Sequence, residues 1–105
     1  MSDIVVVSIA CASQDEADRL GRLLVEHQLA ACVQTHAIRS TYRWQGAIES
    51  ADEVMLTAKT LAARLTALEK MVLAHHSYEV PEILAGPVIW AGDAYRTWLY
   101  DCIAG

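Results

Sequence analysis

The pattern of hydrophobic positions predicts that the chain begins with a strand and an amphipathic helix. Residues 4–10 form a run of mostly apolar residues, many of them β-branched, which is typical of a strand covered on at least one face. Ser13 can cap a helix, and Glu16, three residues later, completes a capping box. Leucine and alanine then recur at helical spacing opposite a charged face, so the helix is expected to continue to about Gln28.

The next segment has the composition of a long β-hairpin. Residues 32–44 are rich in side chains that favour strands, and Gln45 with Gly46 suits a turn because glycine accepts positive φ. A returning strand over residues 47–59 gives each arm about a dozen residues, which is roughly 40 Å. A helix of about 15 residues spans only about 22 Å. The hairpin is therefore expected to overhang the helices, and its free end needs a partner.

A second helix is predicted after the hairpin. Thr60 can cap its first turn, and the helical pattern breaks near residues 75–76. Its buried stripe consists of apolar residues at helical spacing: Leu61, Leu65, Leu68 and Val72.

The C-terminal part predicts one more strand and one more helix. Residues 82–85 and 87–89 are short apolar segments, and proline cannot donate to a β-ladder, so this strand is expected at an edge or with a bulge. Asp93 can cap the final helix. The order β-α-β-β-α-β with a C-terminal helix is the ferredoxin-like split βαβ sandwich, an α+β fold with two helices on one face of an antiparallel sheet.

Length and composition favour one domain that associates with copies of itself. The chain has 105 residues, which fits a single domain over residues 1–105. Apolar residues make up 54% and charged residues 20%, and a small domain cannot bury that much apolar surface internally. The net charge of −5 argues against a nucleic-acid-binding module. No run of about 18 apolar residues predicts a membrane span.

The cysteines indicate a reduced, cytoplasmic protein. They are three in number and include no CxxC pair. Cys32 and Cys102 are expected to be small core residues, whereas Cys11 is expected to be the most accessible of the three. The sequence motifs of dinucleotide-binding proteins, P-loop proteins, serine hydrolases and zinc peptidases are absent. No nucleophile–base pair supports an enzyme.

Two groups of residues are candidates for binding. Residues 75–82 carry histidines and carboxylates, which suit Cu(II) or Zn(II); alternatively, the histidine that ends the helix interacts only with the helix dipole. Arg39 and Arg43, with Lys59 on the partner strand, could hold an anion between subunits, or form a solvated, salt-bridged face. The aromatic residues are all Tyr or Trp, which suit subunit interfaces and pocket walls.

Several segments together resemble the CutA divalent-cation tolerance family. The resemblance runs in order from about residue 4 to about residue 100 and is carried by residues 24–33, 40–46, 53, 59–60, 75–83 and 95–99. It implies a cytoplasmic homotrimer whose long hairpins pair with strands of neighbouring subunits. It also implies a link to tolerance of copper and other divalent cations.

The resemblance also implies a set of metal ligands. The family's positions are a first-strand cysteine, a histidine of an HxYE-type motif and the glutamate after its proline, which we assign to Cys11, His75 and Glu82. An ungapped count places the family's cysteine at Ile9, and Cys11 lies two residues later on the same strand face. Ser77 stands where the family usually has proline.

Two hypotheses follow for the function. The first is a homotrimeric tolerance protein, not an enzyme, that binds Cu(II) or another divalent cation. The second is a trimeric signalling or scaffolding module that binds a small anionic ligand in clefts between subunits.

Overall fold

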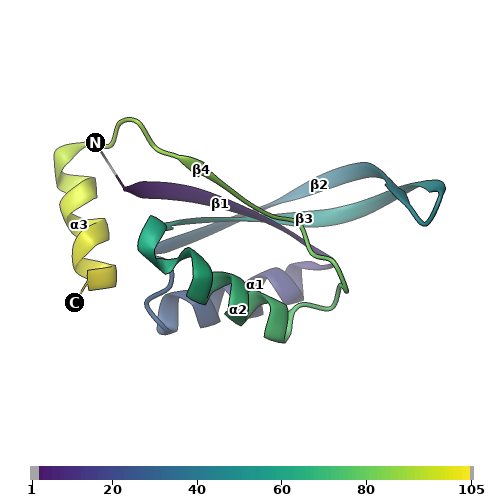
Figure 1. The fold of residues 1–105 in the computed structure, drawn as a ribbon, viewed down its shortest axis with the longest axis horizontal. Coiled ribbons are helices and arrows are strands. Elements are labelled where there is room, and N and C mark those ends of the chain that lie inside the picture. The colour runs from purple at the N-terminus through teal and green to yellow at the C-terminus, as the bar shows by residue number, and fades with distance from the viewer. Residues whose placement is uncertain (1–2, 105) are drawn as a thin grey trace.

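Four antiparallel strands form one sheet, and two helices cover one of its faces (Figure 1). The computed structural model describes residues 3–104, so residues 1, 2 and 105 of the predicted domain lie outside the described part. The strands, in the spatial order β2-β3-β1-β4, are β1 (Ile4–Cys11), β2 (Cys32–Trp44), β3 (Ala47–Leu61) and β4 (Ile83–Pro87). The helices are α1 (Gln14–Glu26), α2 (Leu65–His75) and α3 (Asp93–Ala104). The ferredoxin-like prediction is confirmed.

The main core lies between the sheet and helices α1 and α2. Alternate residues of β1 point toward the helices, because successive strand side chains point to opposite faces. These buried residues are Val5, Val7, Ile9 and Cys11, and they pack with Leu20, Leu24, Leu68 and Val72 of the helices. A smaller cluster joins α3 to the end of the sheet through Ile4, Ala31, Leu61, Leu99 and Ile103.

The long hairpin forms as predicted. The pairing of β2 with β3 runs from Cys32 opposite Lys59 to Trp44 opposite Ala47. Gln45 has φ 50° and the following glycine has φ 83°, and a two-residue type I′ turn requires both values to be positive. Residues 41–50 are all exposed and the molecule measures 45 × 25 × 22 Å. The tip of the hairpin therefore extends beyond the helices, as Figure 1 shows.

The start of the second helix differs from the prediction. Thr60 does not cap a helix, because it pairs with Val5 inside the sheet, and Leu61 pairs with Ile4 in the same ladder. The 3₁₀ turn Ala62–Arg64 follows, and α2 begins only at Leu65. Continued pairing with β1 satisfies the backbone of these residues, so strand geometry prevails over the local capping signal.

The last strand and the last helix lie where the sequence predicts them, but the strand is shorter than predicted. β4 pairs only with β1, at an edge of the sheet as expected, and it ends at Pro87 without continuing to residue 89. Asp93 is the first residue of α3, and its carboxylate accepts a hydrogen bond from Arg96. Within residues 3–104, no helix combines the length and the apolar character that crossing a membrane requires.

The close contact between α1 and β2 at Gly21 predicts how a larger residue at this position changes stability. A Cβ at this position would lie 2.9 Å from Cγ1 of Val33. Alanine in place of glycine normally stabilises a helix by about 1 kcal/mol, but overpacking a core costs about 1–3 kcal/mol. We therefore expect Gly21→Ala to lower the free energy of unfolding, as measured by urea denaturation. In the Val33→Ala background the same substitution should raise it, and stabilisation in both backgrounds would contradict the close contact.

Candidate functional site

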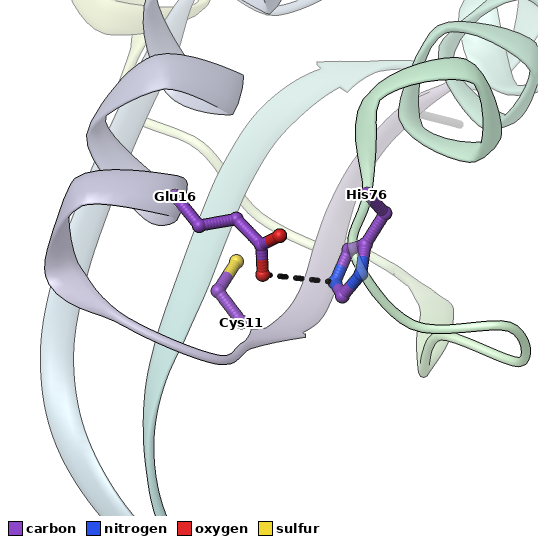
Figure 2. Close-up of side chains that lie close together, drawn as sticks. All are labelled: Cys11, Glu16 and His76. Atoms are coloured by element: carbon purple, nitrogen blue, oxygen red, sulfur yellow. Dashed lines mark ion pairs between the residues drawn. The ribbon is translucent and has the colours of Figure 1, made fainter.

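Three buried side chains from distant parts of the chain meet at the end of β1 (Figure 2). Cys11 is the last residue of β1, Glu16 lies in the first turn of α1, and His76 directly follows α2. One ligand atom from each lies within 4.8 Å of the other two. The side chains of Glu16 and His76 are only 5% and 0% exposed. Sulfur, nitrogen and carboxylate oxygen are together a donor set for borderline divalent cations.

Glu16 connects the start of α1 to the turn after α2. Its Oε1 accepts a hydrogen bond from the Ala12 amide and its Oε2 accepts one from the Ser77 amide, both at 2.8 Å. Ser13 Oγ accepts from the Glu16 amide at 3.1 Å, so the predicted cap forms. The sequence also predicts that the Glu16 carboxylate completes a capping box with Ser13. The carboxylate instead accepts the bonds from Ala12 and Ser77, because folding brings Ser77 close to it.

These hydrogen bonds decide the ionisation of Glu16. Burial alone would raise the pKa of this carboxyl, but hydrogen bonds from Ala12 and Ser77, together with the nearby His76, lower it below its usual value. Glu16 is therefore an ionised carboxylate at neutral pH, stabilised mainly by hydrogen-bond donors.

His76 uses both of its ring nitrogens. Nε2 lies 2.8 Å from the carbonyl oxygen of Ala10, and Nδ1 accepts a hydrogen bond from the Tyr78 amide at 3.0 Å. Because the carbonyl can only accept, these partners assign the proton of a neutral imidazole to Nε2. Glu16 Oε1 lies 3.8 Å from the same nitrogen.

Cys11 is buried, which contradicts the expectation that it is the most accessible cysteine. It points into the core in phase with Ile9, whose carbonyl oxygen lies 3.8 Å from its sulfur. Burial, followed by the negative charges of Glu16 and Glu53, raises the pKa of the thiol to about 12. Cys11 is therefore a protonated thiol at neutral pH, and a metal ion would have to displace its proton.

The structure does not bring His75 and Glu82 into this cluster. His75 is exposed, and its Nδ1 lies 3.0 Å from the Met71 carbonyl one turn earlier in α2. Glu82 is exposed and lines a cavity between the outer part of β2 and the segment that follows α2. The sequence analysis does not select His76, although the pattern His-x-Tyr-Glu begins at this residue. It gives Glu16 only a capping role, because the position of Glu16 three residues after Ser13 predicts a purely local contact.

The cavity has a volume of about 770 Å³ and lies on the other face of the sheet. Ala10 lines it and alternates along β1 with Cys11, which points into the helix-side core. Glu53 is 7% exposed and accepts a hydrogen bond from the Tyr78 hydroxyl at 2.7 Å. The lining residues are Ala10, Ser40, Thr41, Tyr42, Trp44, Glu53, Ser77, Tyr78, Glu79, Val80, Pro81 and Glu82.

The predicted basic face lies outside this cavity. Arg39 forms an ion pair with Asp52 at 2.9 Å, and the Lys59 ammonium contacts Gln34. Of the described residues, three carboxylates but no Lys, Arg or His line the cavity. This charge distribution favours a cation over an anion.

Comparison with known proteins identifies related chains. The family model described as CutA1 divalent ion tolerance protein matches residues 5–102. The divalent-cation tolerance protein CutA of Thermus thermophilus is 36% identical over 102 residues, which cover 96% of this chain and 97% of that protein. The chloroplastic protein CutA of Arabidopsis thaliana is 35% identical over 96 residues, covering 90% of this chain but only 53% of that protein.

Solved structures of related proteins have the same fold. CutA from Xylella fastidiosa superposes with a TM-score of 0.93 at 37% identity, covering 97% of this chain and 99% of that chain. The periplasmic divalent cation tolerance protein CutA from Archaeoglobus fulgidus gives a TM-score of 0.94 at 32% identity, covering 95% and 98% of the two chains.

The hydrogen bonds of Glu16 predict a pH-dependent contribution to stability. Glu16→Gln should lower the free energy of unfolding at pH 7 by about 1–3 kcal/mol, because amide bonds to a charged acceptor are lost. The lowered native pKa means that the contribution is present above the unfolded pKa of about 4.3 and disappears as the pH falls through the native value.

Urea denaturation of both proteins between pH 7 and pH 3 measures this difference, which should shrink on the acid side. Glu69→Gln, an exposed change in α2, is the matched control and should leave stability nearly unchanged. A difference independent of pH would contradict the role of the ionised carboxylate.

Proposed function

The chain belongs to the CutA1 divalent ion tolerance family, and from this premise we propose that it binds Cu(II) or a similar divalent cation. In this proposal it contributes to the response to metal ions as a homotrimer in the cytoplasm and is not an enzyme. The observation that carries the proposal is the meeting of Cys11, Glu16 and His76 ligand atoms within 4.8 Å. The three free cysteines agree with a reducing compartment.

The donor set of the cluster fits a borderline cation better than a hard one. Thiolate and imidazole bind Cu(II) and Zn(II) well, whereas Mg²⁺ and Ca²⁺ prefer oxygen alone. The metal would be held by Cys11 Sγ, a ring nitrogen of His76 and a carboxylate oxygen of Glu16. Cys11 must lose its proton and His76 must release a present hydrogen-bond partner. Binding therefore releases protons, and the affinity for the metal ion is expected to decrease as the pH is lowered.

The anionic-ligand hypothesis has less support. The cavity beside β2 would be the natural place for a small molecule, but its lining carries the carboxylates of Glu53, Glu79 and Glu82. The net charge of −5 adds a repulsive long-range field. A cation is therefore the better candidate ligand for this protein.

The uncovered face of the sheet supports a homotrimer. Within residues 3–104, α1 and α2 lie on one face, and α3 contacts only the end of the sheet near Ile4 and Leu61 (Figure 1). Leu84 of β4 is 64% exposed, and Ile89 and Trp90, in the segment between β4 and α3, are 94% and 82% exposed. Exposed apolar surface of this kind is typical of an interface between subunits.

Copper binding tests the ligand set. We expect His76→Gln and Cys11→Ser each to weaken Cu(II) binding at least tenfold, because each removes one ligand from a three-residue site. His75→Gln is the matched control one residue away, and Glu82→Gln tests the remaining sequence-based ligand; both should retain the wild-type affinity. Calorimetric titration on the assembled protein at pH 7 provides the measurement. Loss of binding in His75→Gln but not in His76→Gln would favour the ligand set with His75 and Glu82 over the set with Glu16 and His76. Equal affinity in all variants would reject both ligand sets.

Sedimentation at micromolar concentration tests the assembly. We expect a species of three times the 11.5 kDa subunit mass and no stable monomer. Trp44→Glu introduces a charge on the overhanging hairpin and should shift the population toward smaller species, whereas Leu73→Glu on α2 should not. A wild-type monomer that persists at this concentration would contradict the homotrimer.

A further inference from the structure

The two hydrogen-bond partners of the His76 imidazole fix the position of its proton. Nε2 donates to the carbonyl oxygen of Ala10 at 2.8 Å, whereas Nδ1 accepts from the backbone amide of Tyr78 at 3.0 Å. A carbonyl oxygen can only accept a hydrogen bond and an amide N–H can only donate one. The ring therefore fits this position only in the neutral form that carries its proton on Nε2.

A cation at either ring nitrogen is incompatible with the hydrogen bond from the Tyr78 amide. A cation that binds Nδ1 occupies the lone pair that accepts this bond. A cation that binds Nε2 moves the ring proton to Nδ1, because a metal-bound histidine almost always keeps one ring N–H as a donor. Nδ1 can then no longer accept. In both cases the amide of Tyr78 loses its acceptor, and the backbone at this residue has to shift.

The side chain of Tyr78 resists such a shift. Its hydroxyl donates to Glu53 Oε2 at 2.7 Å, and its ring lies against the imidazole of His76, with ring centroids 4.9 Å apart and planes tilted by 48°. Glu53 is a rigid anchor, because β3 pairs with both β2 and β1 and the residue is only 7% exposed within one subunit. These contacts join atoms of a single chain, so they do not depend on what covers this face of the sheet in the assembled protein.

We propose that Tyr78 is a positioning residue that opposes cation binding at the candidate metal centre and thereby lowers its affinity. Binding at His76 displaces the Tyr78 amide, while the bond between the Tyr78 hydroxyl and Glu53 holds the residue in its unbound position. This inference rests on the proposed function, since it requires His76 to be a ligand. It holds for coordination through either ring nitrogen.

Calorimetric titration of the assembled protein with Cu(II) at pH 7 tests the role of the hydroxyl. Tyr78→Phe keeps the ring against His76 but removes the bond to Glu53, so we expect Cu(II) to bind at least threefold more tightly than to wild type. Tyr100→Phe is the matched control, because the Tyr100 hydroxyl also donates to a carboxylate, that of Asp3, outside the candidate metal centre. Its affinity should stay within twofold of wild type. Unchanged or weaker binding in Tyr78→Phe overturns the proposal.

Hydrogen exchange of backbone amides gives a readout that a purely structural role of Tyr78 would not change. Ligand binding stabilises the native state and therefore normally slows amide exchange. We expect saturating Cu(II) instead to accelerate exchange at the Tyr78 amide at least threefold, because this amide loses its acceptor. The amide of His76 donates to the Val72 carbonyl at 2.8 Å and is the control, which should exchange no faster than in the free protein. Acid quenching followed by mass spectrometry with residue-level fragmentation measures both amides.

The outcomes separate this inference from the metal centre itself. If His76→Gln weakens Cu(II) binding but Cu(II) leaves the Tyr78 amide equally or better protected in wild type, the role of Tyr78 is overturned and the metal centre stands. If His76→Gln binds Cu(II) as well as wild type, His76 is not a ligand, and both proposals are rejected.

Discussion

The arrangement of the cluster of Cys11, Glu16 and His76, and of the cavity beside it, depends on the hydrogen bonds between the end of β1, the start of α1 and the segment after α2. The Ser77 amide donates to Glu16, and the His76 ring donates to the Ala10 carbonyl. Residues 76–82 belong to no helix or strand, and β4 begins only at Ile83. The backbone amides of Ser77 and Tyr78 in this segment are instead held by side chains, those of Glu16 and His76. Because Glu16 and His76 are themselves buried, these bonds are shielded from competing water.

This connection produces two chemically different environments on the two faces of one sheet. On the helix side, amide donors satisfy the carboxylate of Glu16, and the imidazole beside it has a partner at each nitrogen. On the other side, Glu53 accepts a hydrogen bond from the phenol of Tyr78 and, among the described residues, lines a cavity with further carboxylates. The first environment is closed and satisfied, whereas the second is open and carries excess negative charge.

The elements that the sequence predicts correctly are those decided by local pattern. The turn at Gln45 and Gly46 needs positive φ, and the length of the hairpin follows from its first arm, β2, which is rich in strand-forming residues. The helix that starts after Ser13 likewise has a local cap. These features require no information about the rest of the chain.

The structure departs from local sequence signals where tertiary contacts override them. Thr60 carries a capping signal but is held in a ladder opposite Val5. The choice between the adjacent histidines depends on where α2 ends: His75 is its last residue and its ring bonds back to Met71. His76 has ψ 143°, so the chain leaves the helix there and its ring reaches Ala10, 66 residues earlier in the sequence. A contact between residues so far apart in the sequence cannot be predicted from the local spacing of residues.

The burial of Cys11 also bears on which cations the proposed metal centre would select. With a thiol pKa of about 12, deprotonation at pH 7 costs on the order of 7 kcal/mol, at about 1.4 kcal/mol for each pH unit. A cation must offset this cost, together with a lost hydrogen bond of His76, through its bonds to sulfur and nitrogen. Hard cations bind thiolate weakly and do not meet this requirement, whereas Cu(II) leads the divalent series at such donors. At the proposed metal centre, a closed, protonated cluster would therefore select against the abundant hard cations, because only a strong bond to the thiolate would make opening the cluster favourable.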